Sequence, residues 1–149
     1  MRLTRIKLAV ICMLALCFMM PYAAATHAAD EGTGELRPVQ AFDVVAGKVV
    51  KSIPNNADFQ KIADTWLGSV TGLSPQIQAD DKCGHVFRIP LAQPKTVNTG
   101  AITIRTTDIF LFYCPKKPQL LLVFDENRKP YLLQFKADIK PFLKLMDIQ

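Results

Sequence analysis

Two uninterrupted apolar runs constrain the fold of this chain more than any other feature. Ile109 to Tyr113 and Leu120 to Phe124 consist only of large aliphatic and aromatic residues. A strand that buries one face alternates apolar and polar side chains, whereas a continuously apolar strand buries both faces. We therefore expect these runs to form the middle of a sheet that is covered on both sides.

Six β-rich runs pair in sequence order into three predicted hairpins. The expected pairs are residues 39–45 with 48–53, 83–91 with 102–113, and 120–124 with 131–135. Gly47 supplies a permissive backbone in the first turn, and the second pair encloses a loop near residues 94–101. Pro130 has no amide hydrogen to donate, which places it at a strand start or a sheet edge.

Two segments have the periodicity of a helix. Asn55-Asn56 offers an N-cap, and apolar residues then recur every three or four positions from Phe59 to Val70. This pattern predicts a helix of about 14 residues that Gly72 closes. A second, short C-terminal helix is predicted from four residues that share one face: Ile139, Phe142, Leu143 and Met146. The first helix can cover one face of the sheet, and the second helix or a partner subunit is expected to cover the other.

These elements predict an α+β fold. We expect an antiparallel sheet of four to six strands, made of an N-terminal hairpin and a C-terminal meander. One main helix packs on this sheet, and a short helix ends the chain. A single globular domain is expected over residues 38–149, after a polar, flexible lead-in at residues 30–37.

Residues 1–29 have the three-part layout of a secretory signal peptide. A basic head is followed by an apolar run from Leu8 to about Tyr22 and by small residues suited to cleavage within 25–29. This run is shorter than the roughly 20 residues that a spanning helix needs, which favours cleavage over an uncleaved anchor. Lipid attachment at Cys12 or Cys17 is disfavoured because a bulky residue precedes each. We expect a secreted or extracytoplasmic protein of the cell envelope, with no stable membrane span after cleavage.

Removal of the signal also changes the charge of the chain. It takes away three of the 18 basic residues and none of the 13 acidic ones, so the net charge falls from +5 to +2. The remaining basic pairs, Lys116-Lys117 and Arg128-Lys129, lie beside prolines and are typical of solvated turns. Without a clustered basic patch, a nucleic-acid partner is not expected.

Cys83 and Cys114 are the two cysteines that remain after removal of the signal. A hairpin centred near residues 94–101 sets position 83 opposite position 114, and in an oxidising compartment this predicts a disulfide. The alternative is a reactive thiol, because His85 lies on the same strand face as Cys83. It is disfavoured because Cys114 is available as a partner and no third orienting group is identifiable.

No other residue pattern specifies chemistry. One secure histidine and two cysteines do not have zinc-finger spacing, and the acidic pairs Asp80-Asp81 and Asp125-Glu126 match neither a calcium loop nor opposed catalytic carboxylates. We therefore assign no catalytic residue, no metal ligand and no cofactor, and the ligand-binding residues stay unknown.

Four short stretches, spread along most of the mature chain, carry a resemblance to a known family. They are Gly47–Asn55, Thr71–Leu73, Arg88–Leu91 and Leu122–Pro130. In these stretches the chain resembles a family of small uncharacterised exported proteins of Gram-positive bacteria. The resemblance implies no site residue. At the level of the fold, one helix on an antiparallel meander is similar to cystatin-like inhibitors and to PepSY-type domains.

The leading functional prediction is a non-enzymatic exported binding or accessory module. Its partner is expected to be an extracytoplasmic protein or a second copy of the chain. The hairpin around Asp125 to Tyr131, with an exposed sheet edge that adds a partner's strand, is the expected working surface. The alternative is a small secreted hydrolase whose site has no linear motif.

Overall fold

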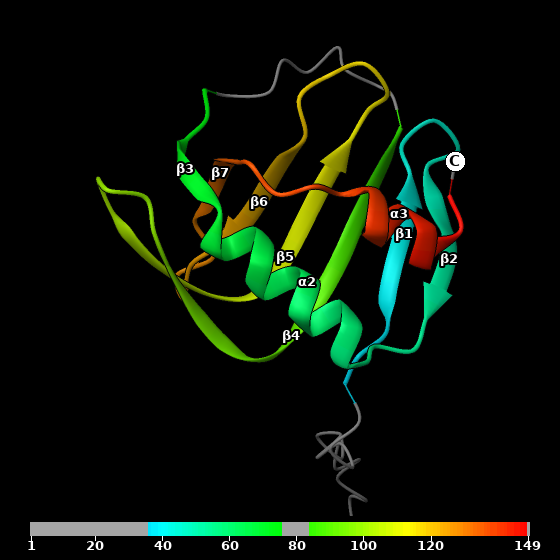
Figure 1. Ribbon diagram of the computed structural model, residues 1–149, viewed down its shortest axis with the longest axis horizontal. Helices are drawn as coiled ribbons and strands as arrows, with labels where there is room; N and C mark the ends of the chain where they lie inside the picture. Colours follow the sequence, from blue (N-terminus) through cyan, green and yellow to red (C-terminus); the bar gives the residue numbers. More distant parts are fainter. Residues whose placement is uncertain (1–35, 76–83, 149) are drawn as a thin grey trace, which may run out of the picture. The chain divides into compact units, whose positions relative to one another are not determined.

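The part of the chain that the structure describes forms one antiparallel sheet of seven strands, with two helices on one of its faces (Figure 1). This computed structural model describes residues 36–75 and 84–148. The strand order is β2-β1-β4-β5-β6-β7-β3. The elements are β1 (Val39–Asp43), β2 (Lys48–Ile53), α2 (Ala57–Gly68), β3 (Val70–Leu73), β4 (His85–Asn98), β5 (Thr103–Tyr113), β6 (Leu120–Phe124), β7 (Pro130–Phe135) and α3 (Lys140–Met146). The α+β class and the three hairpins are confirmed, but the sheet is larger than the four to six strands predicted.

One additional strand comes from the end of the predicted helix. The side chain of Asn56 accepts hydrogen bonds from the amides of Asp58 and Phe59, which starts α2 as expected. The helix ends earlier than predicted, because Ser69 turns the chain and its hydroxyl donates to the Trp66 carbonyl at 2.9 Å. Residues 70–73 then form β3, which pairs with β7.

The hairpin of β4 and β5 is longer than predicted. The loop expected at residues 94–101 is wrong, because β4 continues to Asn98 and β5 begins at Thr103. Pro90 pairs with Asp108, whereas Lys95 pairs with Thr106, so β4 gains three extra residues between these positions. The extra residues let the far end of the hairpin bend away from the sheet, as the two strands do in Figure 1.

The observed register of β4 and β5 differs by one residue from the one that had placed position 83 opposite position 114. His85 pairs with Tyr113, and this register, continued by one residue, sets Gly84 rather than Cys83 opposite Cys114. Gly84 has a φ of +72°, and a Cβ there would overlap the Tyr113 carbonyl oxygen, so the position requires glycine. Cys83 lies outside the described residues, as do residues 1–29 with the predicted signal peptide, and the disulfide stays a prediction.

Both helices pack on the same side of the sheet. The Phe142 ring of α3 lies 4.9 Å from the Trp66 ring and 5.9 Å from the Phe59 ring of α2 (centroid distances). It also lies 5.0 Å from the ring of Phe87, whose side chain points from β4 toward the helices. Lys51 of β2 pairs with Asp147 at 3.0 Å beside the end of α3. Of the two covers expected for the second face, α3 is therefore excluded, and a partner subunit stays a prediction.

Candidate functional site

The face of the sheet opposite α2 and α3, called the open face below, is covered by neither helix. Strand register aligns five apolar residues in one row across β2, β1, β4, β5 and β6: Val49, Phe42, Val86, Phe112 and Leu120. Val49 is 50% exposed and Phe42 is 37% exposed, and the other three are half-buried. The row exists because the central strands are apolar on both faces, while the helices bury only one of them.

A second row of the open face mixes apolar and charged residues. Gln40, Arg88, Phe110, Leu122 and Leu132 occupy paired positions on successive strands. The guanidinium of Arg88 lies 5.9 Å from the centre of the Phe110 ring, a cation–π contact. Arg88 thus brings a positive charge beside the aromatic ring of Phe110 on the open face.

Asp108 of β5 organises the charges at this end of the open face. Its carboxylate accepts from Arg88 Nε at 2.8 Å and from the Thr107 hydroxyl at 2.9 Å. Arg37 Nη2 lies 3.2 Å from both carboxylate oxygens. The Asp108 side chain is only 15% exposed. Two guanidinium groups therefore share one largely buried carboxylate, which fixes the orientation of Arg88.

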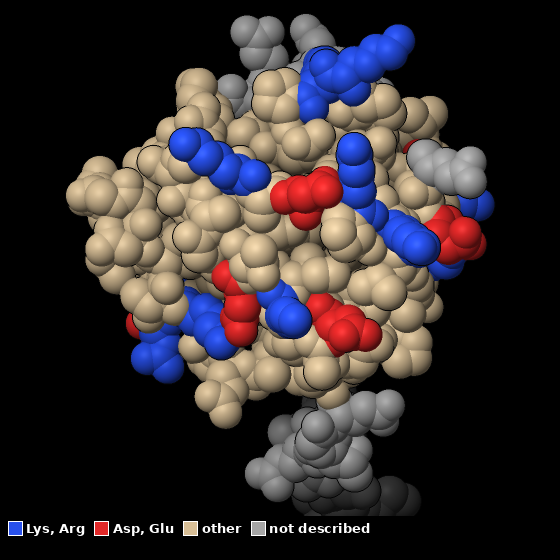
Figure 2. All heavy atoms as spheres, in the orientation of Figure 1, with Lys and Arg blue, Asp and Glu red and all other residues tan. Residues whose placement is uncertain are grey.

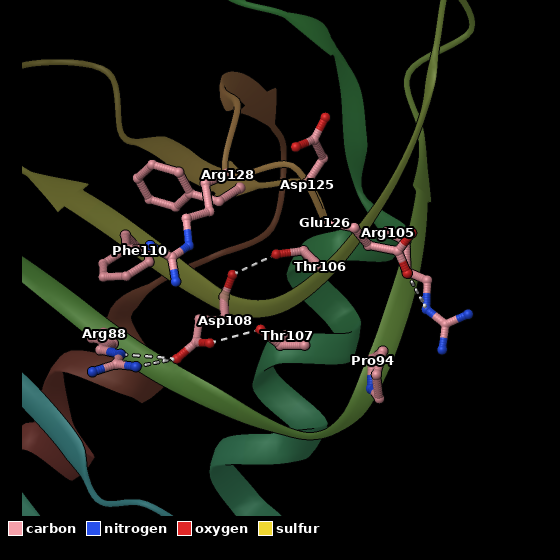
Figure 3. A pocket seen from close by; sticks show the side chains of 11 residues that line it. Arg88, Pro94, Arg105, Thr106, Thr107, Asp108, Phe110, Asp125, Glu126 and Arg128 are labelled. Atoms are coloured by element: carbon pink, nitrogen blue, oxygen red, sulfur yellow. Dashed lines mark hydrogen bonds and ion pairs between the residues drawn. The ribbon is translucent and has the colours of Figure 1, made fainter.

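A pocket of about 440 Å³ opens beside this cluster (Figure 3). Its lining comes from β4, β5, β6 and the turn between β6 and β7: Arg88, Pro94, Arg105, Thr106, Thr107, Asp108, Phe110, Phe124, Asp125, Glu126 and Arg128. The rings of Phe110 and Phe124 meet edge to face at 5.7 Å. Arginines, carboxylates and aromatic rings thus surround one cavity of the size typical for small-molecule sites.

Asp125 builds the turn that carries Arg128. Its carboxylate accepts from the amides of Asn127 and Lys129, both at 2.8 Å, and from the Tyr131 hydroxyl at 3.2 Å. Its carbonyl accepts from the Arg128 amide at 2.9 Å. Arg128 has a φ of +61°, in the left-handed region that non-glycine residues seldom occupy. The turn therefore holds Arg128 in a fixed and costly backbone conformation.

The hairpin of the predicted working surface joins two strands that are not at a sheet edge. The hairpin around Asp125 to Tyr131 joins β6 and β7, and β7 pairs with β3 on its other side. The edge strands of the sheet are β2 and β3. The hairpin therefore contributes to the pocket on the open face, and it is not itself the sheet edge.

His85 and Asp43 form a second polar pair, on the helix-covered side of β1 and β4. The two side chains approach to 3.9 Å, and the His85 ring stacks on Phe87 at 5.7 Å. The amide hydrogen bond from Ala46 is the main factor that lowers the pKa of Asp43, assisted by the Val45 amide and by the nearby His85 and Lys48. Cys83, the nucleophile of the thiol alternative, lies outside the described residues, as do Asp80 and Asp81.

Residues 36–75 and 84–148 contain no cluster of three or more histidine, cysteine or acidic residues placed to hold a metal ion. No helix in these ranges is long and apolar enough to cross a bilayer. On the face that carries α2 and α3, basic and acidic side chains are interspersed (Figure 2).

Sequence reasoning missed the pocket residues Arg88, Asp108 and Phe110, and it included Arg128 only as part of the predicted working surface around Asp125 to Tyr131. Arg88 interrupts the apolar run from Val86 to Leu91, and Asp108 directly precedes the apolar run that begins at Ile109, which was an available signal. Arg128 was interpreted as a solvated turn charge, and its left-handed backbone has no mark in the sequence. Comparisons with protein-family models, curated proteins and solved structures found no match.

Proposed function

We propose that this protein is a non-enzymatic binding or accessory module that works outside the cytoplasm, and that it binds its partner through the open face. The observation that supports this proposal is the apolar row from Val49 to Leu120 across five strands. No helix or strand in the described ranges covers this row. Two of its members, Val49 and Phe42, are exposed, and apolar patches on an uncovered face mark interaction sites in soluble proteins.

The shape and composition of the open face suit a protein partner. A sheet face packs well against another sheet or a helix, at a separation of about 10 Å for two sheets. Aromatic residues are enriched in protein interfaces, and the open face presents Phe42, Phe110, Phe112 and Phe124. Each Å² of apolar surface removed from water contributes roughly 25 cal/mol to association. Either an extracytoplasmic protein or a second copy of the chain meets these requirements.

The sheet edges are less suited to a partner than the open face. On the β2 edge, Lys48 and Lys51 are charged, and edge lysines oppose strand addition. On the other edge, β3 is only four residues long. These features favour binding by the open face over the addition of a partner's strand.

The decisive experiment compares Phe112→Arg with the matched variant Leu145→Arg. Phe112 lies in the apolar row, whereas Leu145 is 42% exposed on α3. Association of the mature protein is measured by light scattering at increasing concentration and by quantitative affinity capture from the native extracellular fraction, after circular dichroism has verified folding. We expect wild type and Leu145→Arg to form the same complex, and Phe112→Arg to lose it.

Two results would overturn the proposal. The first is a wild-type protein that stays monomeric and captures nothing in stoichiometric amount. The second is equal loss of the complex in both variants. The non-enzymatic part of the proposal would be overturned if the protein turned over a substrate in a broad hydrolase screen and a single polar substitution abolished this activity.

A further inference from the structure

We infer that the pocket at the end of the open face binds a carboxylate attached to an apolar body, with Arg128 as the ion-pairing group. The inference rests on the proposed function, because the pocket opens on the same face. It goes beyond that function by naming the chemistry of a ligand. Three independent features of the pocket support it.

The first feature is an aromatic floor beneath a cavity of adequate size. Phe110 and Phe124 meet edge to face at 5.7 Å, and Phe124 is 37% exposed. The pocket volume of about 440 Å³ is sufficient for a group of the size of an amino-acid side chain with its carboxylate. The exposed ring surface would be covered by a flat or branched apolar group.

The second feature is the state of the acidic groups in the lining. Asp108 already accepts from Arg88 and Thr107, and Asp125 is occupied by turn amides and the Tyr131 hydroxyl. Glu126 lies 3.5 Å from Arg105 Nε. Among the described residues, Arg128 is therefore the one lining arginine without a carboxylate within ion-pair distance.

The third feature is the conformation that presents Arg128. Its side chain extends from the β6–β7 turn into the pocket (Figure 3). Its φ of +61° is unfavourable for arginine, and four hydrogen bonds to Asp125 hold the turn in place. Strain held by the surrounding structure is typical of ligand clamps. The turn thus fixes the backbone of Arg128, an exposed residue whose unpaired guanidinium lies beside an apolar floor.

The charge of the surroundings selects the class of anion. A guanidinium binds a carboxylate through two parallel hydrogen bonds. A phosphate would bring a second negative charge close to Asp108, Asp125 and Glu126. A singly charged carboxylate is therefore favoured, and its apolar body lies on Phe110 and Phe124.

To test this, the folded mature protein is titrated with N-acetylphenylalanine and, separately, with its uncharged amide. Binding is monitored by the backbone NMR resonances. We expect the carboxylate to shift resonances of residues 105–110 and 124–128, and the amide to bind at least about tenfold more weakly. Arg128→Gln should weaken binding of the carboxylate by a similar factor. Lys129→Gln, which removes the same charge from a residue outside the pocket lining, should stay within about twofold of wild type.

Several results would overturn the inference. They are equal binding of the acid and the amide, equal loss in Arg128→Gln and Lys129→Gln, or inorganic phosphate that competes as well as the carboxylate. The Phe112→Arg variant separates this inference from the proposed function, because Phe112 does not line the pocket. If Phe112→Arg loses association but still binds the probe, the inference about the pocket stands. If the protein associates normally but does not bind the probe, only the inference about the pocket is overturned.

Discussion

Replacement of Phe142 by alanine should destabilise the protein more than any substitution of similar size on the open face. Phe142 is 0% exposed, and its ring contacts Phe59, Trp66 and Phe87 at 4.9 to 5.9 Å. Truncation of a buried phenylalanine costs about 3–5 kcal/mol. The three aromatic contacts join both helices to the sheet, so we expect about 4 kcal/mol, a large part of the 5–15 kcal/mol typical of a domain.

The assay is urea unfolding followed by tryptophan fluorescence, with Phe42→Ala as the matched control. Phe42 is the same residue type on the open face and is 37% exposed. Its truncation removes less buried surface and leaves no enclosed cavity, so we expect a loss below about 2 kcal/mol. Both variants should keep the slope of the urea dependence of wild type if only stability changes.

The comparison tests the position of α3 directly. If Phe142→Ala costs less than about 1.5 kcal/mol, or no more than Phe42→Ala, then the ring does not bridge the two helices and the sheet. The arrangement that leaves the open face uncovered would then be refuted. A melting temperature lowered by more than roughly 10 °C in Phe142→Ala alone would agree with it.

Four further predictions concern single interactions in the fold: a helix cap, a carboxylate, a turn and a disulfide. Asn56→Ala should cost about 1 kcal/mol in urea unfolding, because two amides of the first turn of α2 lose their acceptor, and an unchanged midpoint would contradict this. The pKa of Asp43 is lowered in the folded state, so its contribution to stability is present above the ordinary aspartate pKa of about 3.9 and is lost as the pH falls through the lowered pKa. Asp43→Asn should therefore flatten this part of the curve of unfolding free energy against pH. A curve identical to that of wild type would contradict this prediction. Arg128→Asn should raise the free energy of unfolding by up to about 1 kcal/mol, since asparagine tolerates the left-handed backbone better than arginine. The same substitution should remove carboxylate binding. A destabilised variant would show that the turn is not strained. Reduction of the predicted disulfide between Cys83 and Cys114 should cost roughly 3–4 kcal/mol, and mass spectrometry after non-reducing alkylation would contradict the disulfide if it found two free thiols.

The sequence was sufficient for the elements whose pattern is local. The start of α2 at Asn56 and the pairing of β6 with β7 follow from a capping residue and from two apolar runs around a turn. β3 was missed because Val70 continues the three-and-four spacing of the preceding helix. The end of α2 depends on Ser69, whose hydroxyl contacts Trp66 and the Ala137 amide, and a partner 68 positions away cannot be inferred from a local window.

The pocket could not be predicted because it depends on register. Arg88 meets Asp108 only because β4 and β5 pair with the observed alignment, and Arg37 reaches the same carboxylate from 71 positions away. The three extra residues in β4 then move the far end of the hairpin relative to this cluster. A one-residue error in register transfers every side chain of a strand to the other face. Composition and spacing alone therefore do not assemble these groups.

The continuous apolar runs of β5 and β6 contain more hydrophobic surface than residues 36–75 and 84–148 bury in their core. Phe59, Ala63 and Trp66 of α2 and Phe142 and Met146 of α3 are buried on one face of the sheet. α3 has seven residues, about 10 Å of helix, which cannot extend over the second face as well. Phe112 and Leu120 are only partly buried, so a polar residue at either position would cost the isolated fold less than one in the core. The absence of such residues from the row is explained if selection acts on a bound state, in which the open face is covered by a partner.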